Sequence, residues 1–123
     1  MNILLIDDEH ISNFVNKKLI EHIDASVNAI AFNDPEAAFD QLDYIKPDLI
    51  FLDINMPVMN GWDFLNRMVA EAKDYKVVVL TSSVNSIDYK RASKYVNVIG
   101  YVEKPATMAV LTPYITEVLA AVA

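Results

Sequence analysis

Side chains that can do chemistry follow four apolar runs of the sequence. Asp7 and Asp8 come directly after the run ILLI, and Asp53 closes the run DLIFLD. Thr81 lies near the end of KVVVLTS, and Lys104 ends VIGYVEK. Carboxylates held close together repel one another and raise each other's pKa. A hard divalent cation with oxygen ligands offsets this repulsion, and a lysine ammonium neutralises part of the remaining charge.

A carboxylate in such a cluster can accept a phosphoryl group as a nucleophile and form an acyl phosphate. Phosphoryl transfer depends mainly on positioning and on stabilising charge. Mg²⁺ suits the site because it binds one or two carboxylates together with phosphate oxygens. Asp53 is the expected acceptor, since it is predicted to lie between the acid pair on one side and Thr81 and Lys104 on the other.

The elements that must position these side chains are five apolar runs that alternate with five helical patterns. The expected strands cover residues 3–6, 27–32, 48–53, 76–82 and 98–104, and the expected helices cover 11–23, 33–45, 61–72, 86–96 and 107–122. Continuous apolar runs are typical of parallel strands buried on both faces. Because crossovers between parallel strands are right-handed, the pattern predicts a doubly wound α/β fold with five parallel strands and five helices. Such folds bind ligands outside the carboxyl ends of the strands, where the chemical side chains are expected to meet.

Local signals support the helices. Apolar residues at helical spacing form a stripe in the first one: Ile11, Phe14, Val15, Leu19 and Ile23. Asp34 is the expected N-cap of the second helix, with Pro35 in its first position. Pro113 falls inside the last helix, where a proline costs about 3 kcal/mol, so a kink or a delayed start is expected.

Composition limits the class of protein. The 123 residues fit one domain, expected to cover residues 1–123. Hydrophobic residues make up 54%, but no apolar run is long enough to cross a bilayer, so no membrane association is expected. The absence of cysteine favours a cytoplasmic location. The net charge of −7 disfavours nucleic-acid binding by this domain alone, because the only basic cluster is Lys90, Arg91 and Lys94.

Four segments in order, LLIDDE, LIFLDINMPVMNGWDFL, VVVLTSS and GYVEKP, resemble the receiver domain of bacterial two-component response regulators. The resemblance covers essentially the whole chain, and the general likeness is to stand-alone members such as the chemotaxis regulator that binds the flagellar motor. It implies a flavodoxin-like sheet with strand order 2-1-3-4-5. It also implies a phospho-acceptor domain of a phosphorelay rather than an enzyme, with slow autophosphorylation and autodephosphorylation chemistry of its own.

The resemblance implies a role for each matching residue. Asp53 is the phosphorylated residue. Mg²⁺ is held by the carboxylates of Asp7, Asp8 and Asp53 and by the backbone carbonyl of Asn55. Thr81 and Lys104 contact the phosphoryl group.

Tyr101 is the aromatic residue that turns inward on activation and so changes the face formed by the fourth helix, fifth strand and fifth helix. The side chains of Asn55 and Ser83 are expected to tune the lifetime of the phosphoryl group. The phosphoryl donor is a sensor histidine kinase or a histidine phosphotransfer protein, and the output is an unnamed downstream protein.

The chain departs from the family pattern in three places. Asn60 replaces the more common acid before Gly61, the stretch RASKYVNVIGY lacks the usual glycine after the fourth helix, and Pro113 lies in the last helix. Two other classes of protein fit the sequence less well. An aspartyl-phosphate phosphatase would need its nucleophile at the end of the first strand. A flavodoxin-like cofactor binder would need a phosphate-binding loop of Gly, Ser and Thr where this chain has the acidic DDEHIS.

Overall fold

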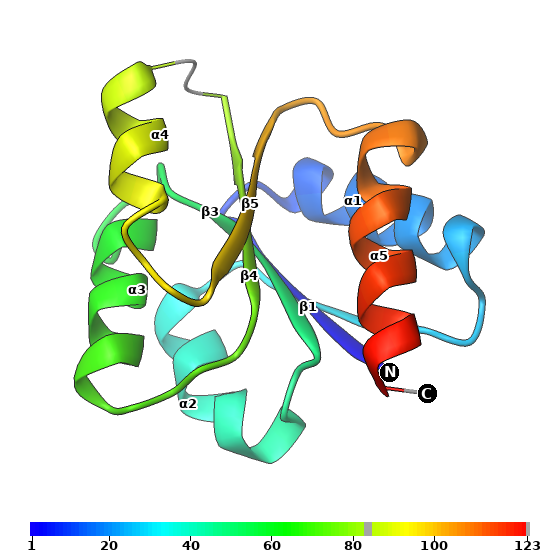
Figure 1. The fold of residues 1–123 in the computed structure, drawn as a ribbon, viewed down its shortest axis with the longest axis horizontal. Helices are drawn as coiled ribbons and strands as arrows, with labels where there is room; N and C mark the ends of the chain where they lie inside the picture. Colours follow the sequence, from blue (N-terminus) through cyan, green and yellow to red (C-terminus); the bar gives the residue numbers. More distant parts are fainter. Residues whose placement is uncertain (83–84, 123) are drawn as a thin grey trace.

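The computed structural model describes residues 1–82 and 85–122. It contains one parallel sheet in the order β2-β1-β3-β4-β5, which confirms the expected fold class and strand order. The strands are β1 (Asn2–Ile6), β2 (Asn28–Phe32), β3 (Leu49–Asp53), β4 (Val77–Thr81) and β5 (Val98–Glu103). Each expected strand was right to within one residue at either end, and Figure 1 shows their common direction.

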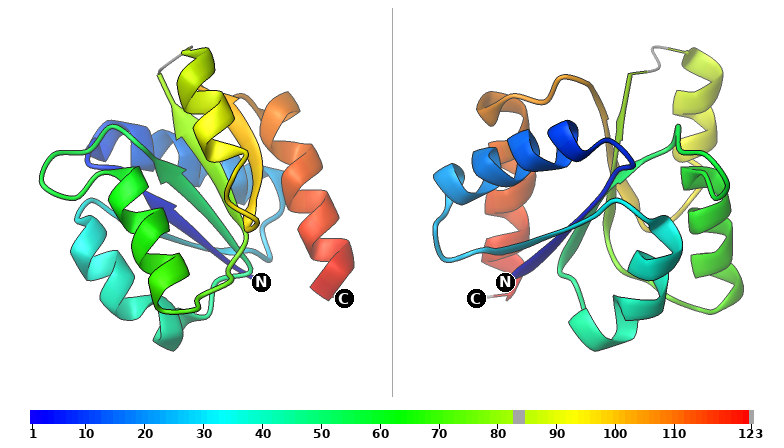
Figure 2. Two further views of the ribbon diagram at one scale, coloured as in Figure 1. Left: turned by 60° about the vertical axis from the view of Figure 1, so that its left-hand side comes forward. Right: turned by 180° about the vertical axis from the view of Figure 1, so that it is seen from behind.

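The helices are α1 (His10–Ile23), α2 (Pro35–Ile45), α3 (Gly61–Ala70), α4 (Ser86–Ala92) and α5 (Met108–Val122). They form two layers, with α1 and α5 against one face of the sheet and α2, α3 and α4 against the other (Figure 2). Within the described ranges, no helix is both long and apolar enough to span a membrane.

Alternation along the buried strands fills both layers. Leu49 and Phe51 of β3 pack with Ile20 and the α5 residues, whereas Ile50 and Leu52 pack with the α2 and α3 residues. Every residue of β3 and of β4 is buried. This is the pattern of a sheet covered on both faces, and it explains why these strands are continuous apolar runs in the sequence.

Only part of the apolar stripe of α1 packs on the sheet: Leu19 and Ile23 lie against the core, whereas the residues nearer the start of the helix face outward. Ile11 and Phe14 are 79% and 63% exposed, while Asn13 and Asn16 are buried along with Ile20. The spacing predicted the helix correctly, and the structure shows which part of the stripe is buried. The buried Asn13 amide has hydrogen-bond partners at the ends of the strands, and these hold α1 in its observed orientation.

Helix ends follow the expected chemistry. The Asp34 side chain accepts a hydrogen bond from the Glu36 backbone N–H, so it caps α2 as predicted. Pro113 lies within α5, which starts at Met108, so the proline does not delay the helix. The expected fourth helix is four residues shorter in the structure, since the turn after Ala92 continues with hydrogen bonds between residues three apart, such as Tyr95 N–H to the Ala92 carbonyl.

Candidate functional site

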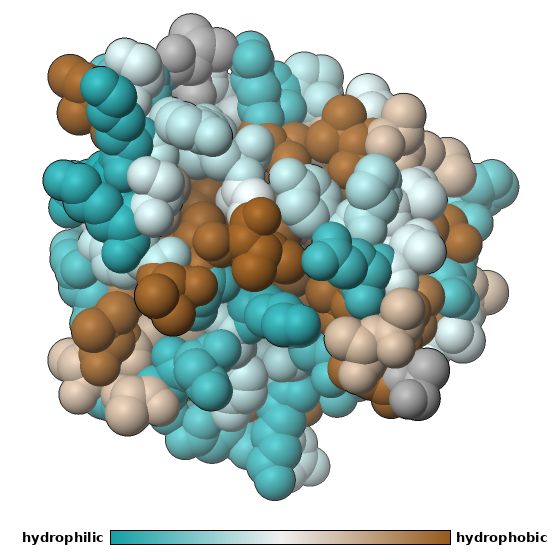
Figure 3. Space-filling model, viewed as in Figure 1, coloured by the Kyte–Doolittle hydropathy of each residue, from teal (hydrophilic) through white to brown (hydrophobic). Residues whose placement is uncertain are grey.

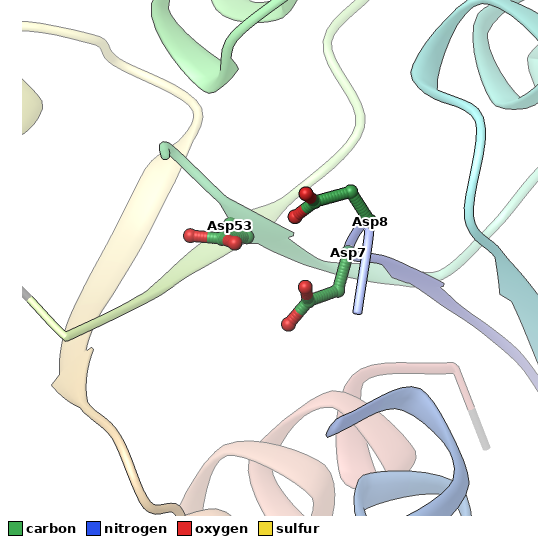
Figure 4. A group of neighbouring side chains, drawn as sticks. All are labelled: Asp7, Asp8 and Asp53. Carbon is green, nitrogen blue, oxygen red and sulfur yellow. The ribbon is translucent and has the colours of Figure 1, made fainter. Parts of the chain in front are cut away.

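Three carboxylates meet at the carboxyl edge of the sheet. Asp7 and Asp8 follow β1, and Asp53 is the last residue of β3, the strand next to β1. One oxygen atom from each carboxylate lies within 4.8 Å of the others. Figure 4 shows the three side chains reaching into the same region from the two strand ends. Asp7 and Asp53 are each 3% exposed, whereas Asp8 is half-buried and open to solvent.

Lys104 provides the positive charge of this cluster. Its Nζ donates to Asp7 Oδ2 and lies 3.4 Å from Asp53 Oδ2. The Lys104 backbone N–H donates to the Thr81 carbonyl at 2.7 Å, which fixes the end of β5 beside the end of β4. One ammonium group therefore contacts two buried carboxylates. The cluster of Asp7, Asp8, Asp53 and Lys104 carries a formal charge of about −2 when all four groups are ionised.

Burial raises the pKa of Asp53, and the charge of Asp7 adds to that effect. The Asn55 backbone N–H and the Lys104 ammonium work in the opposite direction but do not cancel it. Burial by itself lowers the pKa of Lys104, but its hydrogen bond to Asp7 and the charges of Asp53 and Asp7 outweigh this and raise it. The contacts with the acids therefore favour the charged form of the lysine, whereas burial disfavours the ionised form of Asp53.

Asn55 connects the acid cluster to Thr81. Its backbone N–H donates to Asp53 Oδ1 at 3.0 Å, and its side-chain Nδ2 donates to Thr81 Oγ1 at 3.1 Å. Thr81 is fully buried at the end of β4. The contact between Asn55 and Thr81 was not predicted, because nothing in the sequence indicates that residues 26 positions apart share a hydrogen bond.

Tyr101 is half-buried in β5, where its ring meets the Tyr89 ring of α4 edge to face, with centroids 5.5 Å apart. It packs against the core on the α2–α4 side of the sheet. Ser83, the second residue predicted to affect phosphoryl lifetime, lies outside the described residues.

The loop from β3 to α3, which follows Asp53, is fixed by buried side chains and a backbone hydrogen bond. Met56 and Met59 are buried, and the Gly61 N–H donates to the Ile54 carbonyl at 3.1 Å. Asn60 caps α3 by accepting from the Asp63 N–H, and the Asp63 carboxylate accepts from the Asn60 N–H in return. Asn60 thus caps α3, a role that was not evident from its replacing the acid that is more common at this position in the family.

A second hydrogen-bond network, also missed from the sequence, supports the end of β1. The Asn13 amide Nδ2 lies within hydrogen-bond distance of the Asp7 carbonyl, the Phe32 carbonyl and Asn33 Oδ1. The Glu9 N–H donates to Asp7 Oδ1 at 2.9 Å. The sequence signal for this network was an asparagine within the first predicted helix. A buried asparagine is stable only where its amide has hydrogen-bond partners.

Comparison with known proteins agrees with this geometry. Residues 3–116 match the family described as the response regulator receiver domain. The chain is 32% identical over 82 residues to the chemotaxis protein CheY of Listeria monocytogenes, which covers 67% of this chain and 68% of that protein. It is 31% identical over 107 residues to a protein-glutamate methylesterase/protein-glutamine glutaminase of Bacillus licheniformis, covering 86% of this chain but only 30% of that longer protein.

Comparison with solved structures points to the same family. A crystal structure of a two-component response regulator from Cytophaga hutchinsonii superimposes with a TM-score of 0.85 at 30% identity, and the match covers 97% of this chain and 96% of that one. Phosphorylation of an aspartate in two-component signalling is the general function of the matched family. With the family match, the strand order and the acidic cluster in agreement, the chain belongs to the response regulator receiver domain family.

Proposed function

We propose that Asp53 is the residue of this chain that is phosphorylated, and that the donor is a phosphohistidine of a sensor histidine kinase or a histidine phosphotransfer protein. The observation that carries the proposal is the cluster itself: three carboxylates with oxygens within 4.8 Å, and Lys104 in contact with both buried ones. Asp53 is the member of this cluster that contacts both Lys104 and the loop amide of Asn55.

In the transfer, a carboxylate oxygen of Asp53 attacks phosphorus, and the bond from phosphorus to the donor nitrogen breaks. The electron pair of that bond leaves with the imidazole, and an acyl phosphate forms on Asp53. Lys104, whose Nζ lies 3.4 Å from Asp53 Oδ2, is proposed to stabilise negative charge on the phosphoryl oxygens, and the Thr81 hydroxyl is proposed to donate a hydrogen bond to one of them.

The donor set fits Mg²⁺. The cluster offers only oxygen ligands, and Asp8 is open to solvent, which suits an ion that keeps several waters. The proposed ligands are the carboxylates of Asp7, Asp8 and Asp53 and the backbone carbonyl of Asn55. A bound Mg²⁺ would neutralise the excess negative charge of the carboxylates and would stabilise negative charge on the transferring phosphoryl group.

Phosphorylation is proposed to work as a switch. It replaces one negative charge on Asp53 with about two and adds acceptor oxygens. For Thr81 to turn its hydroxyl toward these oxygens, the hydrogen bond from the Asn55 amide to Thr81 Oγ1 has to break or rearrange. Movement of Thr81 then allows Tyr101 to turn inward from its contact with Tyr89, which changes the face formed by α4, β5 and α5.

The domain is proposed to be a signalling module whose own chemistry is limited to slow autophosphorylation and autodephosphorylation. The side chains of Asn55 and Ser83 are proposed to set the lifetime of the acyl phosphate by controlling the approach of water. The downstream partner is a protein that recognises the changed face. A cytoplasmic location and a single domain over residues 1–123 are part of the same proposal, since they suit an exchange with a kinase.

The test is intact-mass spectrometry after incubation with acetyl phosphate and Mg²⁺. The expected result is a gain of one phosphoryl group, about 80 Da, that disappears in Asp53→Ala and in EDTA. A matched control is Asp34→Ala, which removes a carboxylate that caps α2 outside the cluster and should still be labelled. Labelling that persists in folded Asp53→Ala would contradict the assignment of the acceptor.

A further inference from the structure

A groove of about 690 Å³ lies between α3 and α4, and none of its lining residues belongs to the candidate site. In Figures 1 and 2, α4 lies above α3 along one edge of the molecule. The residues that line the groove are Asn66, Ile87, Lys90, Arg91, Lys94 and Tyr95. This lining consists of three cations, two side chains with apolar surface and one amide, and contains no acid.

The charge of the groove is opposite to that of the chain. Three of the ten basic residues of a chain with a net charge of −7 line it. Lys90, Arg91 and Lys94 are exposed, and none has a carboxylate within 4.0 Å in the part of the chain that the structure describes. Figure 3 shows hydrophilic residues gathered at the upper left, over the position of α4.

The nearby acids of α3 are already engaged. Asp63 belongs to the cap of that helix, and Glu71 pairs with Arg67 at 3.1 Å. The three cations of the groove are therefore available to an acidic partner without competition from these carboxylates. Unpaired like charges on one face also repel one another, so neutralising them on binding is favourable.

The floor of the groove is ordered. The Tyr95 hydroxyl donates to Asn66 Oδ1 at 2.6 Å and so joins the end of α4 to α3. The Tyr95 ring stacks on Trp62 with centroids 6.2 Å apart, and the Arg91 guanidinium lies over Trp62 at 4.4 Å. Beside this floor, Ile87 is 71% exposed and offers an apolar contact. A preformed floor lowers the entropy lost on binding.

We infer that the groove between α3 and α4 docks an acidic helical segment of a partner protein. Lys90 lies in α4 and Lys94 in the turn that continues it, so the two ammonium groups stand four residues apart at one end of the groove, a spacing that suits carboxylates at positions i and i+4 of a partner helix. A leucine or similar residue between those acids would lie on Ile87 and Tyr95, which is the helix-in-groove mode of recognition.

This surface differs from the face that phosphorylation is proposed to change. The hollow on the other side of α4 is lined by Tyr89, Ala92 and Ser93 together with β5 residues, and it shares no residue with the groove. The inference thus goes beyond the proposed function. A nucleic acid would also meet the three cations, but it would have to approach a chain that carries a net charge of −7, so the acidic segment is favoured.

The experiment measures binding of a fluorescein-labelled helical peptide that repeats Glu-Leu-Ala-Gln, by anisotropy, with a peptide that repeats Gln-Leu-Ala-Gln as its control. The test variant is Lys90→Gln/Lys94→Gln, and the matched variant Lys17→Gln/Lys76→Gln makes the same change in net charge elsewhere. Both variants leave Arg91 on Trp62, so the tryptophan fluorescence is a second readout of binding.

The expected result is that the Glu peptide binds, the Gln peptide does not, and the groove variant weakens binding about five- to tenfold while the matched variant changes it less than about twofold. Salt should weaken the binding. Absence of binding, equal losses in both variants, or full competition by a single-stranded oligonucleotide would each overturn the inference. Both variants should still accept a phosphoryl group from acetyl phosphate, so a failure here is separable from a failure of the proposed function.

Discussion

Gly61 is the position where one added methyl group should disturb both the fold and the site. A Cβ on Gly61 would lie 2.6 Å from the Ile54 Cα, 2.7 Å from the Asp53 carbonyl oxygen and 2.8 Å from the Ile54 Cγ2. The shortest of these is about 0.8 Å less than the 3.4 Å at which ordinary contact begins. Two of the three atoms belong to the backbone that carries the acceptor, so the strain cannot be relieved by turning a side chain.

Overpacking of this kind costs about 1–3 kcal/mol. We expect Gly61→Ala to lower the free energy of unfolding by about 2 kcal/mol. Because relief of the clash moves the backbone next to Asp53, phosphorylation by acetyl phosphate should also slow by about tenfold or more. Urea denaturation gives the first quantity, and the rate of mass gain gives the second.

Gly100→Ala is the matched control. A Cβ there would lie 2.5 Å from Tyr114, but only from the far end of its ring and its hydroxyl, and this half-buried side chain can move. Its cost should stay below about 1 kcal/mol, since alanine also loses less chain entropy than glycine on folding. If Gly61→Ala proves as stable and as reactive as Gly100→Ala, the close approach under Asp53 does not constrain the loop and the reasoning is wrong.

Three further predictions test other parts of the structure. Asp8→Asn should weaken Mg²⁺ binding by about tenfold or more in calorimetric titration, and an unchanged affinity would remove Asp8 from the ligand set. Since burial raises the pKa of Asp53, the metal-free fold should lose stability as pH rises through the folded pKa. Asp53→Asn in EDTA should therefore be more stable than the unmodified chain near pH 7, and this gain should shrink as the pH falls through the raised folded pKa toward the ordinary value of about 4; a gain independent of pH would exclude this cause. Phe64→Ala should cost about 3–5 kcal/mol and Phe14→Ala less than about 0.5 kcal/mol in thermal unfolding, whereas equal costs would contradict the orientation of α1.

Much of the fold and of the cluster could be predicted because both depend on short-range patterns. Runs such as DLIFLD identify strands buried on two faces, and the rule that parallel strands share a carboxyl edge brings Asp7, Asp8 and Asp53 together without any knowledge of contacts. The cap of α2 by Asp34 also depends only on neighbouring residues.

The remaining features depend on contacts between residues far apart in the chain. Helical spacing groups Ile11 and Phe14 on one side of α1, but it does not show that Asn13 finds partners at the strand ends and so turns that side outward. The hydrogen bond from Asn55 to Thr81 and the approach of Gly61 to Ile54 are likewise set by packing.

The order of the elements and the edge of the sheet at which the reactive groups gather thus follow from the sequence, because periodicity and strand direction are local properties. The contacts of Lys104 with Asp7 and Asp53, and the hydrogen bond between Asn66 of α3 and Tyr95 beyond α4 in the basic groove, are set by tertiary packing. Each of these contacts joins residues at least 29 positions apart, so their geometry is fixed only when the two layers of helices pack on the sheet.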